Sequence, residues 1–75
     1  MNDKEKLSHL EEIFDVDDGT LSPEMDLADI DAWDSLAAIT LVTFVSETFN
    51  VKLRGAQIRS FRTVRDILDV MKSNG

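Results

Sequence analysis

Few residues in this sequence could take part directly in chemistry. The 75-residue chain contains a single histidine, His9, and no cysteine, which excludes disulfides, thiolate metal sites and a cysteine nucleophile. Charged residues surround His9 on a predicted helix, so we expect a solvent-facing side chain rather than a general base, and no catalytic triad can be assembled. Ser35 is also of interest, because its hydroxyl is predicted to lie at the start of a helix. We therefore expect no enzymatic activity, and Ser35 is either a functional residue or an ordinary capping serine.

A second candidate site is the acidic run that begins at Asp15. The segment Asp15-Val-Asp-Asp-Gly begins like an EF-hand calcium loop. Counting Asp15 as the first ligand puts Thr20 at the position of the sharp-turn glycine and Asp26 where a bidentate glutamate is needed. This spacing argues against calcium, and we expect no metal site.

The spacing of apolar residues predicts the elements that would position Ser35. A first amphipathic helix is expected over 3–14, where apolar residues recur at helical spacing: Leu7, Leu10, Ile13 and Phe14. The segment 15–33 lacks sustained periodicity and is predicted to be a long loop. Its apolar residues should anchor it against the helices: Leu21, Met25, Leu27 and Ile30. A second helix is expected from Ser35 to about Thr48, with Asp34 as its N-cap, although Ser35 itself could be the cap. Its apolar face should comprise Leu36, Ile39, Leu41, Val42, Val45 and Phe49.

The last third of the chain predicts two more helices. Residues 50–55 should form a connection with Val51 and Leu53 pointing inward, and 56–61 a short helix. Thr63 should open the last helix, because Asp66 three residues later resembles a capping box. The apolar side of that helix should comprise Val64, Ile67, Leu68, Val70 and Met71, and Asn74-Gly75 should end it. We therefore predict an all-α fold, a single domain over 1–75 with three main helices and one short helix.

The net charge of −7 is unevenly distributed along the chain. Residues 1–34 hold twelve acids and two lysines, whereas residues 35–75 hold six basic residues and three acids. Such an acidic chain repels nucleic acid and is attracted to proteins with basic patches, unless the charge serves only solubility. No segment approaches membrane-spanning length, and the charged residues 1–6 do not resemble a signal peptide. We expect a cytoplasmic monomer that binds neither nucleic acid nor membranes.

The tripeptide Asp34-Ser35-Leu36 resembles the attachment motif of acyl carrier proteins. The resemblance spans about Leu7 to Met71, and the order of elements around the tripeptide supports it. An amphipathic helix and a long loop come before the tripeptide. After it come an apolar helix ending in Glu47-Thr48-Phe49, then Val51-Lys52-Leu53, a short helix, and Thr63-Val64 opening the last helix. The resemblance implies an acyl-carrier-like bundle. It also implies that Ser35, flanked by Asp34 and Leu36, receives a 4'-phosphopantetheine arm from coenzyme A through a magnesium-dependent phosphopantetheinyl transferase. The thiol of the arm would then carry an acyl or aminoacyl group as a thioester.

The expected modification suits the position of Ser35. A phosphodiester anion at a helix start meets unpaired backbone N–H groups and the positive end of the helix dipole. Asp31 and Asp34 would repel that anion, so we hypothesise that they contact a basic or magnesium-bearing partner. Trp33 could shield the phosphate of the arm, contact partners, or simply pack against the second helix.

The second helix departs from the pattern of fatty-acid carriers, which place acids along it. Residues 35–46 are uncharged, and Ala37 and Thr40 occupy positions where acids would be expected, while Arg54, Arg59, Arg62 and Arg65 add positive charge nearby. The expected contacts with acyl-loading and acyl-processing enzymes are Asp31, Trp33, Ala37, Thr40, Glu47 and Arg54. This departure favours a specialised pathway, such as polyketide-like or aminoacyl-carrier chemistry, over housekeeping fatty-acid synthesis.

Two further points stay open: whether the carried group is sheltered, and whether the protein is modified at all. If the carried group is sheltered, Ile39, Ile58 and Phe61 are candidates to line an acyl groove between the second helix and the short one, although ordinary core packing would also explain them. The alternative function is an unmodified helical adaptor that binds a partner helix.

Overall fold

The computed structural model describes residues 2–72, and its regular elements are helical. The elements in chain order are α1 (Asp3–Phe14), a 3-10 turn η1 (Leu27–Asp29), α2 (Ser35–Phe49), α3 (Gly55–Ser60) and α4 (Val64–Val70). The predicted all-α fold, with three main helices and one short helix, is confirmed. The boundaries differ by one residue at α2 and α3, and Phe61 therefore lies in the connection to α4 rather than in the short helix. Helix α4 ends at Val70, and Asn74-Gly75, predicted to end it, lies outside the described residues.

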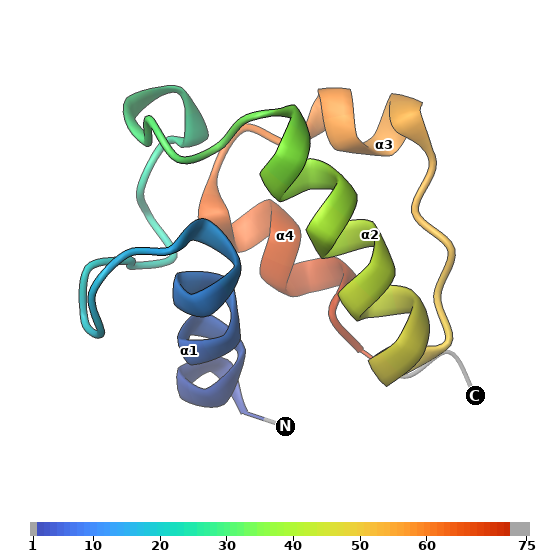
Figure 1. Ribbon diagram of the computed structural model, residues 1–75, viewed down its shortest axis with the longest axis horizontal. Helices are drawn as coiled ribbons and strands as arrows, with labels where there is room; N and C mark the ends of the chain where they lie inside the picture. The colour runs from blue at the N-terminus through green and yellow to red at the C-terminus, as the bar shows by residue number, and fades with distance from the viewer. Residues whose placement is uncertain (1, 73–75) are drawn as a thin grey trace.

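The main helices α1, α2 and α4 enclose the core, with α3 lying near the N-terminal end of α2 (Figure 1). Each main helix contributes side chains that are almost completely buried: Leu10, Leu41, Val45, Val64, Ile67 and Leu68, together with Met71 just after α4. Burying an aliphatic side chain of this size stabilises a fold by about 1.5–3 kcal/mol. A domain this small depends strongly on these few contacts.

Side-chain caps explain where the helices begin. Asn2 caps α1 by accepting a hydrogen bond from the amide of Glu5 at 2.9 Å. Asp66 accepts bonds from the amides of Arg62 at 2.8 Å and Thr63 at 3.2 Å, so its predicted capping role at α4 is confirmed. These bonds satisfy amides that would otherwise lack an acceptor at a helix start.

The predicted apolar face of α2 is partly wrong. Its buried residues are Ala37, Leu41, Val45 and Phe49, spaced four apart. Leu36 and Ile39 are instead 72% and 65% exposed. Apolar residues occupy every position from 36 to 39, so periodicity alone could not select a face; packing against the rest of the bundle selects it.

The long loop between α1 and α2 is held in place by buried side chains and by backbone hydrogen bonds. Leu21, Leu27 and Ile30 are buried as predicted, and Met25 is partly buried against the core. Backbone hydrogen bonds also tie the loop to the segment that enters α4: the amide of Leu27 donates to the carbonyl of Arg62 at 2.8 Å, and further bonds join Val64 to Met25 and Arg65 to Pro23. The loop and the α3–α4 connection therefore form one continuous surface.

The expectation that His9 faces solvent is wrong. Its side chain is only partly exposed, and its ring centroid lies 4.9 Å from that of Phe44 on α2. The imidazole therefore contributes to the packing of α1 on α2 as an aromatic ring.

Within residues 2–72, no helix combines the length and apolar character needed to cross a membrane.

Candidate functional site

Ser35 is the first residue of α2, and its side chain is exposed. The sequence left open whether Asp34 or Ser35 caps the helix. Asp34 does so, since its carboxylate accepts a hydrogen bond from the amide of Ala37 at 2.9 Å. Across the described part of the chain, the Ser35 hydroxyl has no hydrogen-bond partner, so it is available to a modifying enzyme.

The backbone around Ser35 fits an attached anion. In residues 2–72, the amides of Ser35 and Leu36 donate to no protein acceptor, and the first turn of α2 contains no acidic residue. Unpaired amides at the N-terminus of a 15-residue helix attract negative charge. The exposed Asp31 and Asp34 add nearby negative charge that water partly screens.

A shallow pocket of about 250 Å³, here called the serine pocket, adjoins Ser35. Its lining residues are Trp33, Asp34, Ser35, Ala38, Ile58, Arg59 and Phe61. Ile58 and Phe61, two of the three residues expected to line a groove, are thus brought next to Ser35. Ile39 does not line this pocket; Ala38 on the neighbouring face of α2 does.

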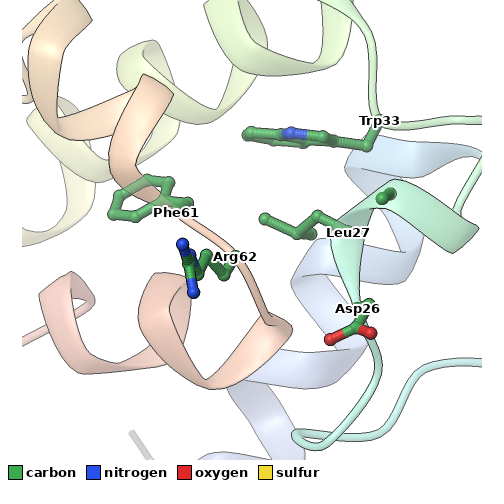
Figure 2. A pocket seen from close by; sticks show the side chains of 6 residues that line it. Asp26, Leu27, Trp33, Phe61 and Arg62 are labelled. Carbon is green, nitrogen blue, oxygen red and sulfur yellow. The ribbon is translucent and has the colours of Figure 1, made fainter.

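A second pocket of about 490 Å³, here called the arginine pocket, lies next to the first. Its lining residues are Asp26, Leu27, Ala28, Trp33, Phe61 and Arg62. Figure 2 shows the Trp33 and Phe61 rings on opposite sides of the space, with Leu27 below Trp33 and the Arg62 guanidinium below Phe61. Sequence reasoning missed this pocket, because its walls come from the long loop and from the α3–α4 connection.

Trp33 contributes to the walls of both pockets. Its ring is partly buried, with its centroid 5.6 Å from that of Phe14, and it lines both pockets. Phe14 itself is buried in the core. The tryptophan is therefore an aromatic wall that packs on Phe14 of α1 and lies beside Ala38 of α2 in the serine pocket.

Most of the expected partner contacts lie on the surface. Asp31, Thr40, Glu47 and Arg54 are exposed. Ala37 is only 5% exposed, so the expectation that it faces a partner is wrong. The residues that replace it on the surface of α2 are Leu36 and Ile39, which the sequence analysis assigned to the core and the groove.

The exposed face of α2 is apolar and uncharged near Ser35. It is formed by Leu36, Ile39, Thr40, Thr43 and Glu47, which recur at helical spacing. The hydroxyls of Thr40 and Thr43 donate to the carbonyls four residues earlier, at 2.9 and 3.2 Å. Glu47, near the far end of the helix, carries the only charge on this face.

Asp66 organises the segment that carries Phe61 and Arg62. The backbone amides of Arg62 and Thr63 donate to its carboxylate and hold its pKa below the ordinary value of 3.8. The ionised carboxylate thus fixes the backbone of Arg62, while the Arg62 side chain extends along the arginine pocket.

Residues 7–71 match the family model described as the phosphopantetheine attachment site. An acyl carrier protein of Syntrophobacter fumaroxidans (strain DSM 10017 / MPOB) is 36% identical over 59 residues, which cover 79% of this chain and 73% of that relative. No solved structure gives a significant match.

Proposed function

Because the chain belongs to the acyl carrier family with a phosphopantetheine attachment site, we propose that Ser35 is the residue that carries the arm. The observation that supports this assignment most strongly is the Ser35 hydroxyl at the start of α2, which is exposed and has no hydrogen-bond partner within residues 2–72. Asp34 fulfils the capping role that a serine at this place would otherwise have. The capping explanation for Ser35 therefore loses its support.

The arm supplies a thiol that holds an acyl group as a thioester. The chain's own contribution is to present and position the attachment point. The amides of Ser35 and Leu36 have no protein acceptor and would attract the phosphodiester, and Trp33 and Phe61 line the pocket beside Ser35. A carrier of this kind is first modified by the transferase that installs the arm and then presents its cargo to acyl-loading and acyl-processing enzymes.

Intact mass after incubation with coenzyme A, magnesium and a promiscuous phosphopantetheinyl transferase tests the assignment. We expect the native protein to gain the mass of one arm and Ser35→Ala to gain none. Ser8→Ala, which removes an exposed serine on α1, is the matched control and should be modified normally. Uptake by Ser35→Ala would assign the arm to another residue, and no uptake by the native protein would favour an unmodified adaptor.

We further propose that the protein serves a specialised pathway rather than housekeeping fatty-acid synthesis. The support is the exposed face of α2, which lacks charge from Leu36 to Thr43. Arg54 and Arg59, both exposed on or beside α3, add positive charge nearby. Complementary charge governs the rate of encounter and the choice of partner, so an enzyme with a basic docking patch gains little attraction here.

The variant Thr40→Glu/Thr43→Glu tests this second proposal. Each new exposed ion pair contributes about 0.2–1 kcal/mol, so two acids should strengthen the encounter with a basic fatty-acid malonyl transferase about two- to thirtyfold. The measurement is kcat/KM for the holo forms of the native protein and the variant at low salt. High salt is the control, because it should screen away the gain. A native protein that already matches a fatty-acid carrier, with no gain from the two glutamates, would contradict a specialised pathway.

A further inference from the structure

The exposed charges on the two sides of Ser35 have opposite signs. On the side of the long loop, Asp31 and Asp34 are exposed. On the side of α3 lie residues 50–62, here called the α3 segment (Figure 1). This segment contains no acidic residue and four basic ones, all exposed: Lys52, Arg54, Arg59 and Arg62. Ser35 therefore lies where a negative and a positive surface meet, although the chain as a whole carries a net charge of −7.

The positive charge of the α3 segment is not neutralised within the described part of the protein. Over residues 2–72, the ion pair found joins Arg65 to Asp3, and no carboxylate lies within salt-bridge distance of a basic group of the α3 segment. The Arg59 guanidinium lies back along α3, with its Nη1 3.2 Å from the point where a side-chain carbon on Gly55 would lie. This charge is thus near the start of α3, where Arg54 is the N-cap. The cations of the segment remain available to a partner.

Helix α2 adds exposed apolar surface beside this charge. Leu36 directly follows Ser35, Ile39 lies one turn further along the helix, and both side chains are largely exposed. Protein interfaces typically combine an apolar centre with a polar or charged rim. The surface around Ser35 has this composition, so it is suited to contact with another protein.

The mixture of charges argues for a protein partner rather than a nucleic acid or a membrane. Asp34 and Arg59 line the same pocket, and Asp31 is exposed nearby. A phosphate backbone or an anionic lipid surface is negative throughout, so the two acids would repel it. A protein surface can instead present acidic groups to the α3 segment and basic or neutral groups to the loop.

We propose that the α3 segment is the docking surface for a partner enzyme that is acidic beside the entrance to its active site, with Arg54 and Arg59 making the charged contacts. This proposal rests on Ser35 carrying the arm. Ion pairs on the α3 side would orient the carrier so that the start of α2 faces that entrance. The net charge of the chain predicts a basic partner, but salt screens exposed charges beyond about 8 Å, so the charges beside Ser35 govern docking.

The test compares two enzymes that differ only in the charge of their docking patch. The first is a fatty-acid malonyl transferase with a basic patch, and the second is the same enzyme with two basic residues of that patch replaced by glutamates. Each is added to the nitrogen-15-labelled chain without its arm, at low salt. NMR titration then measures the dissociation constant and identifies the backbone amides that the enzyme contacts.

We expect the glutamate form to bind about two- to thirtyfold more tightly than its basic parent, the effect of two exposed ion pairs, with the largest shifts in the α3 segment. Arg54→Gln/Arg59→Gln should abolish this preference, and Arg54→Lys/Arg59→Lys should retain most of it. Arg54→Glu/Arg59→Glu should reverse it, so that the basic parent binds more tightly. Lys4→Gln/Lys6→Gln is the matched control, because it removes two positive charges from α1 and should leave the preference unchanged.

Equal binding of the two enzymes, or a preference that survives Arg54→Gln/Arg59→Gln, would overturn the proposal. Binding to phosphatidylserine vesicles, or self-association in sedimentation, would also overturn it if either depended on these arginines while neither enzyme was preferred. The intact-mass test of Ser35 separates this proposal from the function on which it rests. Uptake of the arm without a charge preference would exclude the docking surface alone, whereas a charge preference without uptake would exclude the carrier function alone.

Discussion

Glu11 offers a sharp test of how the long loop is held against the bundle. Its side chain is only 5% exposed, and its carboxylate Oε2 accepts a hydrogen bond from the amide of Leu21 at 3.0 Å. Leu21 is itself 5% exposed, so this amide has little access to water. Replacing Glu11 by Ala removes the acceptor and leaves a buried donor without a partner.

The magnitude follows from the kind of bond that is lost. A hydrogen bond to a charged group contributes about 1.5–3 kcal/mol, and an unsatisfied buried amide costs about 1–3 kcal/mol. A domain of this length has a total free energy of unfolding of roughly 4–11 kcal/mol. We therefore expect Glu11→Ala to lower the free energy of unfolding by about 1.5–3 kcal/mol, a substantial part of the total.

Urea denaturation and amide hydrogen exchange measure the effect. Glu11→Gln keeps an oxygen acceptor and should lose less stability than the alanine variant. Glu12→Ala is the matched control, because Glu12 is the exposed neighbour on the same helix, and it should change stability little. In Glu11→Ala the Leu21 amide should exchange faster, yet arm uptake at Ser35 should persist because Asp34 caps α2 separately. Equal destabilisation by Glu12→Ala, or unchanged Leu21 exchange in Glu11→Ala, would show that the Glu11 carboxylate does not hold the loop.

Two caps allow further tests. Asp34→Ala should lower the free energy of unfolding, measured by urea denaturation, by about 0.5–2 kcal/mol, because the Ala37 amide loses its acceptor. Asp34→Asn keeps an oxygen acceptor and should keep most of the stability. Equal losses in both variants would contradict the capping role of Asp34. The pKa of Asp66 is lowered in the folded state, so its stabilisation is present above the unfolded value and is lost as the pH falls through the folded one. From about pH 4 downward the native protein should therefore lose more stability than Asp66→Asn in thermal melts, and parallel pH profiles would contradict this assignment.

Most of the helices could be predicted because their signals are local. The spacing of Leu7, Leu10 and Phe14 predicted α1 within its observed bounds, and Asp66 three residues after Thr63 predicted the start of α4. Caps and periodicity involve residues within one or two turns of each other, so the sequence order already contains them. The same local order predicted that Ser35 stands at the start of a helix.

The faces and pockets could not be predicted in this way, because they depend on contacts between distant segments. Apolar residues from Leu36 to Ile39 allowed several faces of α2, and packing against the rest of the bundle buried Ala37 while it exposed the two larger side chains. His9 similarly packs against Phe44 on another helix, a contact that the charged neighbours of His9 in the sequence did not indicate.

Local signals in the sequence thus define which residues form helices and where the candidate attachment serine lies. What surrounds that serine depends instead on contacts between distant segments of the chain. Backbone hydrogen bonds join the long loop to the α3–α4 connection, and this pairing brings Trp33, Phe61 and Arg62 to one pocket. Residues that are far apart in the chain meet there only after the core has formed, since the loop-closure entropy of bringing them together is offset by burial elsewhere.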